Sequence, residues 1–91
     1  MIAKVVLGTM QNAKRIVSIA ETIPHDVELC CGRYVVDAKS MLGVLSMPEF
    51  ETAEMHIHTD NRKECDKILS QLLEAELLID CLLYTSDAAD E

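Results

Sequence analysis

Apolar residues alternate with polar residues in some segments of the chain and recur every three or four residues in others. Residues 2–7 form a β-branched, apolar run that ends at Gly8, which predicts a first strand. Thr9 is a favourable N-cap residue, and the apolar positions after it return at helical spacing until Pro24, so we expect a helix here. Its apolar stripe is Ala13, Ile16, Val17, Ala20 and Ile23.

The middle of the chain predicts a hairpin and then a short helix. Apolar and polar residues alternate over 26–31, which indicates a half-buried strand with Cys31 inward and Cys30 outward. Gly32 and Arg33 are typical of a tight hairpin turn, and residues 34–36 form the returning strand. A short helix with Ser40 at its first turn follows, and it ends near Pro48.

The last part of the chain predicts one more strand and one more helix. Residues 53–59 alternate again, with Met55 and Ile57 on the inner face. Glu54, His56 and His58 share the other face. We expect Asp60 to cap the last helix. The apolar stripe of that helix is Cys65, Ile68, Leu69, Leu72, Leu73 and Leu77.

The predicted order of elements is β-α-β-β-α-β-α, which defines the expected fold class. Four short strands and three amphipathic helices can bury their apolar faces together if the helices all cover one side of the sheet. The sequence therefore predicts an α+β open-faced β-sandwich, with a four-stranded antiparallel sheet and three helices on one face.

The C-terminal segment changes the predicted boundaries of the domain. Residues 81–91 resemble the translation of an adapter used in DNA sequencing libraries, so we predict that the domain spans residues 1–80 and that 81–91 are not native. Without the three acids of this segment the formal charge changes from −8 to −5. The length suits one domain.

The composition of the chain argues against several classes of function. An acidic chain lacks the basic footprint of a nucleic-acid-binding protein. No apolar run approaches the roughly 20 residues of a membrane span, and no signal peptide is recognisable, so we expect a cytoplasmic protein with no membrane insertion. Three cysteines in residues 1–80 do not form a disulfide framework, which agrees with a reducing compartment.

The segment Ala38–Met47 carries a family resemblance. It reads Ala-Lys-Ser-Met-Leu-Gly-Val-Leu-Ser-Met. This closely resembles the segment around the regulatory serine of HPr, the small phosphocarrier of the bacterial phosphoenolpyruvate-dependent sugar phosphotransferase system, where the pattern is near Ala-Lys-Ser-Ile-Met-Gly-Val-Met-Ser-Leu. The HPr fold also has the order of elements predicted above, and the spacing from Ser40 back to the first helix fits the family without a gap.

The resemblance implies a regulatory site at Ser40. In Gram-positive members this serine is phosphorylated by HPr kinase, and the phosphorylated surface binds a catabolite control protein. A phosphate here would add nearly two negative charges at a helix N-terminus, where they are favoured. The residues that match the partner-binding surface are Lys39, Met41, Leu42, Gly43 and Leu45.

The chain departs from the family at the phosphate-accepting histidine. The family motif is His-Ala-Arg-Pro-Ala, whereas this chain has Gly-Thr-Met-Gln-Asn-Ala over residues 8–13. Counting back from Ser40 puts Thr9 at the histidine position, although a trimmed loop would also explain the difference. A phosphothreonine ester is too stable to act as a relay, and Gln11 lacks the charge of the family's arginine. We therefore expect no catalytic residue, no enzymatic activity and no cofactor, and we interpret His25 as a solvated loop residue.

Two alternatives remain open at this stage. The chain could be a true phosphocarrier whose acceptor chemistry is not recognised. It could instead be an α+β module that binds a metal or small ligand through His56 and His58, which lie about 6–7 Å apart on one strand face. A tetrahedral metal site needs a third or fourth ligand, which Glu54 or Cys30 could supply.

Overall fold

The fold is an antiparallel sheet with helices on one face. The computed structural model describes residues 1–48 and 50–83 of the chain, with side chains described through residue 80. The elements are β1 (Ile2–Val6), α1 (Met10–Glu21), β2 (Val27–Cys31), β3 (Tyr34–Asp37), α2 (Met41–Leu45), β4 (Thr52–Ile57), α3 (Arg62–Glu74) and β5 (Leu78–Leu83). The strands lie in the order β3-β2-β4-β1-β5, and each neighbouring pair is antiparallel.

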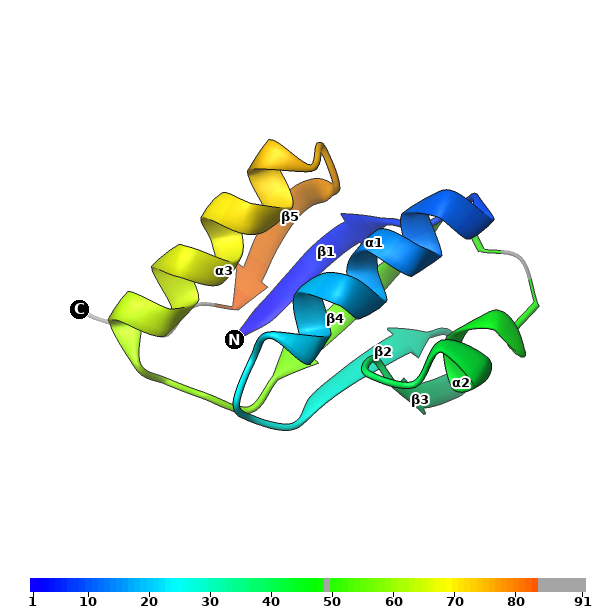
Figure 1. Ribbon diagram of the computed structural model, residues 1–91, viewed down its shortest axis with the longest axis horizontal. Coiled ribbons are helices and arrows are strands. Elements are labelled where there is room, and N and C mark those ends of the chain that lie inside the picture. The colour runs from blue at the N-terminus through cyan, green and yellow to red at the C-terminus, as the bar shows by residue number, and fades with distance from the viewer. Residues whose placement is uncertain (49, 84–91) are drawn as a thin grey trace.

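The core lies between the sheet and the helix layer. All three helices cover the same face of the sheet, and α2 packs beside α1 near the β2–β3 end (Figure 1). Alternate residues of β1, β2 and β4 are buried, as the period of a half-covered sheet requires. Ile16 of α1, Leu29 of β2 and Leu72 of α3 are among the fully buried side chains. The predicted α+β class and the placement of the helices on one face are confirmed.

The prediction of four strands is wrong, because the described residues form a sheet of five strands. Beyond α3 the chain turns back, and β5 pairs with β1 through two register shifts. The reversal is a Schellman-type cap, in which Glu76 N–H donates to the Leu73 carbonyl (3.0 Å) and Leu77 N–H donates to the Leu72 carbonyl (2.9 Å). Glu76 takes a φ of 59°, a position that glycine usually occupies. Leu77, expected in the helical stripe, is buried beyond the helix instead.

Strand β5 crosses residue 80, where we predicted the native domain to end. Residues 84–91 of the predicted non-native segment lie outside the described residues. The origin of residues 81–91 therefore stays a prediction.

Smaller differences concern single residues. Asn61, not Asp60, caps α3, since its side chain accepts a hydrogen bond from Glu64 N–H. Leu73 is exposed rather than part of the buried stripe. Cys31 is buried and Cys30 half-buried on the other face, as predicted. Within residues 1–48 and 50–83, no helix is both long enough and apolar enough to cross a bilayer.

Candidate functional site

Ser40 is the N-cap residue of α2. Its backbone is extended, and its Oγ accepts a hydrogen bond from Gly43 N–H at 3.1 Å. The approach to the helix is held by Asp37, whose Oδ1 accepts from Lys39 N–H at 2.9 Å. The Ser40 side chain is half-buried. The hydroxyl thus lies at the first turn of a helix, where free N–H groups and the positive end of the helix dipole face it.

Gly43 leaves space for this hydroxyl. A Cβ atom at residue 43 would lie 3.3 Å from Ser40 Oγ and 3.8 Å from Val36 Cβ, closer to the oxygen than side-chain carbons usually come. The glycine of the Ala38–Met47 segment therefore serves the close approach of the cap to the helix, although it lowers the intrinsic helix propensity.

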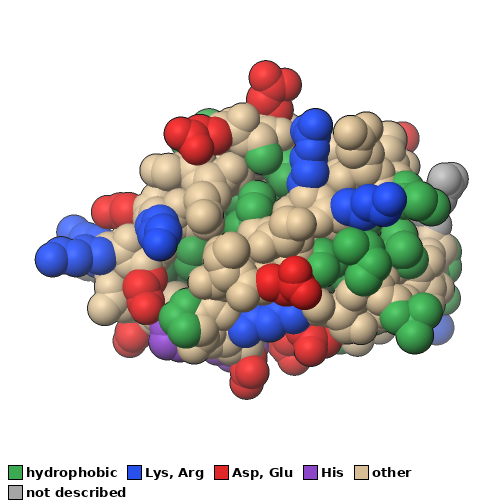
Figure 2. All heavy atoms as spheres, in the orientation of Figure 1, with side chains coloured by type: hydrophobic (Ala, Val, Ile, Leu, Met, Phe, Trp, Pro, Cys, Tyr) green, Lys and Arg blue, Asp and Glu red, His purple; other side chains and the backbone are tan. Residues whose placement is uncertain are grey.

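Apolar side chains surround the Ser40 helix. Only Val44 of α2 is buried, whereas Leu42 is 82% exposed and Leu45 is also exposed. Met10 at the start of α1 is 62% exposed. Hydrophobic side chains gather over the N-terminal end of α1 and over α2 (Figure 2). We call Met10, Leu42, Leu45 and the hollow beside them the α1–α2 surface.

The hollow of the α1–α2 surface has a volume of about 230 Å³. It lies between the β1–α1 loop, the end of α2 and the following loop. Its lining is Leu7, Gly8, Thr9, Met10, Ala13, Val44, Leu45, Met47, Pro48 and Phe50. A mostly apolar, exposed patch of this kind is typical of a protein-binding surface.

Thr9 lies at the same surface and is the N-cap residue of α1. Its Oγ1 accepts from Asn12 N–H at 3.0 Å, and Asn12 Nδ2 donates to the Leu7 carbonyl at 2.8 Å. The three histidines of the chain, His25, His56 and His58, lie away from this surface and do not line its hollow. The arrangement offers two capping hydroxyls at two helix N-termini and no imidazole.

His25 is not simply solvated, contrary to our interpretation from the sequence. Its Nε2 lies 2.8 Å from Glu64 Oε1, and both side chains are only about one-third exposed. Thr59 Oγ1 donates to the same carboxylate oxygen at 2.9 Å. The hydrogen bond from Thr59, and then that from His25, lower the pKa of Glu64 below its ordinary value. His25 therefore joins the α1–β2 loop to the start of α3.

The structure turns His56 and His58 toward different carboxylates. His56 Nε2 lies 3.1 Å from Glu54 Oε1, and His58 Nε2 lies 3.3 Å from Glu28 Oε1. Burial, and then the charges of Glu28 and Glu54, raise the pKa of the Cys30 thiol, which keeps it protonated. In the part of the chain that the structure describes, no group of three or more His, Cys, Asp or Glu could hold a metal ion.

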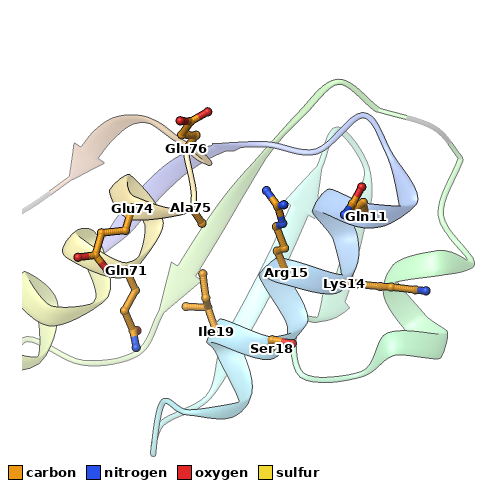
Figure 3. Close-up of a pocket in the computed structure, with 9 residues that line it drawn as sticks. All are labelled: Gln11, Lys14, Arg15, Ser18, Ile19, Gln71, Glu74, Ala75 and Glu76. Carbon is orange, nitrogen blue, oxygen red and sulfur yellow. The ribbon is translucent and has the colours of Figure 1, made fainter.

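A second, larger hollow of about 910 Å³ lies between α1 and the end of α3. Arg15 and Ile19 reach into it from α1, and Lys14 also lines it, with the end of its side chain extending toward α2 (Figure 3). The opposite wall carries Glu74 and Glu76, both exposed. The lining is mixed in charge and solvent-facing, unlike the apolar lining of most small-molecule sites.

Comparison with solved structures shows what this fold resembles. The chain is similar to a protein from Thermoanaerobacter tengcongensis whose crystal structure is described as that of HPr-C-His, with a TM-score of 0.62 and 16% sequence identity. The match covers 97% of this chain and 99% of the other. The fold is therefore HPr-like. By sequence, no protein-family description matches the chain, and no curated protein matches it.

Proposed function

We propose that this protein is a regulatory, protein-binding module of the HPr type, that it is phosphorylated on Ser40, and that it does not carry phosphate on histidine. The observation that carries the proposal is the position of Ser40, a half-buried hydroxyl at the cap of α2 beside the exposed apolar α1–α2 surface. The HPr-like fold and the sequence of Ala38–Met47 support the same proposal.

Phosphorylation would change this surface without unfolding it. A kinase would transfer the γ-phosphoryl group of ATP to Ser40 Oγ, so that an O–P bond forms, the bond to ADP breaks, and the hydroxyl proton passes to a base of the kinase. The new dianion lies at a helix N-terminus and follows Lys39, so both the dipole and the cation favour it. Residues 38–48 contain no acid, and the nearest acid before Ser40 in the sequence is Asp37, whose Oδ1 accepts from Lys39 N–H.

The partners that fit are proteins of the phosphotransferase system, in particular HPr kinase and a catabolite control protein. A partner would bury the exposed side chains of Leu42 and Leu45, with Met41 and Gly43 beside them and an arginine directed at the phosphate. In this role the protein acts by binding and catalyses no reaction.

The chemistry of Thr9 argues against a relay. An imidazole forms a labile N–P bond that can pass the phosphoryl group on, whereas a threonine ester holds it. Thr9 also has a structural role, because its Oγ1 caps α1. A phosphocarrier with unrecognised acceptor chemistry remains the alternative to test.

The test is the intact mass of the protein after incubation with HPr kinase and ATP. We expect the mass of one phosphate to be added to the parent chain and to Thr9→Ala, and none to Ser40→Ala. Thr9→Ala is the matched control, since it removes the other capping hydroxyl of the same surface. Absence of phosphate on the parent chain, or its retention in Ser40→Ala, would overturn the proposal.

A parallel incubation tests the relay. Phosphoenolpyruvate and the first enzyme of the phosphotransferase system replace the kinase and ATP. An acid-labile gain of mass would establish the phosphocarrier alternative, and we expect none.

A further inference from the structure

Strand β3 lies at one edge of the sheet, and no element of residues 1–48 and 50–83 lies beyond it (Figure 1). It pairs with β2 on its inner side only, and α2 packs over its helix-facing side. Val35, on the open face of the sheet, is 58% exposed. This edge is an apolar, β-branched strand with a free side, which is a template for pairing with another strand.

The hairpin determines which backbone groups of β3 face outward. Cys31 and Tyr34 flank a two-residue turn, where Gly32 has a φ of 58°. The residues that flank such a turn form a hydrogen-bonded pair, and pairs of this kind alternate along the ladder. Val36 therefore also bonds to β2. The N–H and C=O of Val35 and the N–H of Asp37 point away from the sheet.

The sequence around this edge is complementary to itself. Residues 33–37 read Arg-Tyr-Val-Val-Asp, with a cation at one end, an acid at the other and apolar residues between. If two copies pair antiparallel with Val35 opposite Val35, then Tyr34 faces Val36 of the second copy and Arg33 faces its Asp37. Each of these contacts occurs twice, as two-fold symmetry requires.

We propose that two copies of this chain associate through their β3 edges to form one continuous ten-stranded sheet. The N–H and C=O of Val35 then exchange two hydrogen bonds across the two-fold axis. Val35 packs on Val35 over the open face, and the Arg33–Asp37 pairs close both ends. A two-fold axis perpendicular to the sheet puts both helix layers on the same side, so that both α1–α2 surfaces face one way and stay accessible.

The occupant favoured by these observations is a second copy rather than an unrelated strand. An unrelated strand could use the same backbone groups, but in the antiparallel register centred on Val35 the cation of Arg33, in the turn before β3, comes opposite the acid of Asp37. The association is weak, because an edge of four residues buries far less area than a stable dimer and the chain carries a formal charge of −8. We expect a dissociation constant on the order of 0.1–1 mM.

The test is sedimentation velocity of the full chain over a concentration series that reaches about 1 mM. The weight-average mass is expected to rise from that of one chain toward that of two. Arg33→Glu places two like-charge pairs across the interface and is expected to weaken association about tenfold. Arg15→Glu makes the same change of charge on α1 and serves as the matched control, with association at the parent level.

A second variant tests the backbone hydrogen bonds. Val35→Pro removes an outward N–H without removing a bond to β2, so association should be lost while the circular dichroism spectrum of the monomer is kept. In a mixture of isotope-labelled and unlabelled chains, the methyl groups of Val35 should show a contact with Val35 of the second copy. A monomer at every concentration, or a dimer that persists in both Arg33→Glu and Val35→Pro, would overturn the proposal.

Discussion

The N-termini of α1 and α2 present the same capping chemistry in different surroundings. Thr9 Oγ1 accepts from the third residue after it at 3.0 Å, and Ser40 Oγ does the same at 3.1 Å. Yet α1 has 12 residues, of which four are buried, whereas α2 has five residues and buries only Val44. One cap supports a helix of the core, and the other supports a short helix that displays apolar side chains.

This difference shows why a hydroxyl at a helix N-terminus does not define a function by itself. At α1 a phosphate relay of the HPr type would require an imidazole, whereas Thr9 has a hydroxyl that caps the helix. At α2 the phosphorylation that we propose requires a hydroxyl, and Ser40 places one next to the exposed α1–α2 surface. The experiments below test this contrast, from the largest expected effect to the smallest.

Introducing the residues of an HPr-type relay at α1 should give that helix N-terminus a phosphate-accepting function. Thr9→His with Gln11→Arg places an imidazole at the cap of α1 and a guanidinium beside it. With phosphoenolpyruvate and the first enzyme of the phosphotransferase system, this double variant should gain an acid-labile phosphate that the parent chain does not gain, measured by intact mass. Gln11→Arg alone is the control and should gain none. A double variant that stays unmodified would show that more than residue identity separates α1 from a relay site.

The two caps should differ in their effect on stability. Loss of an N-cap hydroxyl costs about 0.5–2 kcal/mol. We expect Thr9→Ala to lie near the upper end of this range, because α1 is packed on the core, and Ser40→Ala near the lower end, because a short helix can relax locally. Urea unfolding measures both. Thr9→Ser keeps the hydroxyl and should match the parent chain. An equal loss of unfolding free energy in the two alanine variants would contradict this difference between the caps.

Gly43 provides a test of the space beside the Ser40 hydroxyl at α2. Gly43→Ala should stay within about 0.5 kcal/mol of the parent in urea unfolding, because the gain in helix propensity, about 0.5–1 kcal/mol, is offset by the contact of the new methyl with Ser40 Oγ. The same methyl should slow phosphorylation of Ser40 in the kinase assay. An unchanged rate of phosphorylation would mean that the space beside the hydroxyl has no functional role.

The N-terminus of α3 adds a third cap, the one with an acid in its first turn. Hydrogen bonds from Thr59 and His25 lower the pKa of Glu64 in the folded state. Its carboxylate therefore stabilises the fold at pH values above the ordinary pKa of 4.5. This contribution is lost as the pH falls through the lowered pKa of the folded state. Glu64→Gln should flatten the pH dependence of urea unfolding below pH 4.5 slightly. Glu74→Gln, an exposed acid at the other end of α3, is the control. A variant profile as steep as that of the parent would contradict this role of Glu64.

Local patterns in the sequence predicted much of this molecule correctly. Alternation placed Met55 and Ile57 inward and Glu54 and His56 outward, because a strand half-covered by helices has a period of two. Helical spacing located α1 and most of the buried stripe of α3. The position of Ser40 at the start of a short helix also followed from the residues around it. Each of these signals depends on neighbours only a few residues apart.

The features that the sequence did not predict depend on contacts between distant segments. The contact between His25 and Glu64 joins residues that are 39 positions apart, so no local sequence pattern predicts it. The end of α3 was missed because Glu76 takes the left-handed conformation that glycine usually signals, while Leu77 continues the apolar stripe although it is buried beyond the helix.

By itself the sequence determined the order of the first seven elements, the inward face of each amphipathic segment and the placement of a hydroxyl at the start of α2. The tertiary structure alone decided that β1 is not an edge strand, since β5 pairs with it, and that β3 is one. The physical reason is that a side-chain pattern records which face of a segment is buried, whereas the neighbours of a strand are set by backbone hydrogen bonds that every residue type except proline can donate and accept.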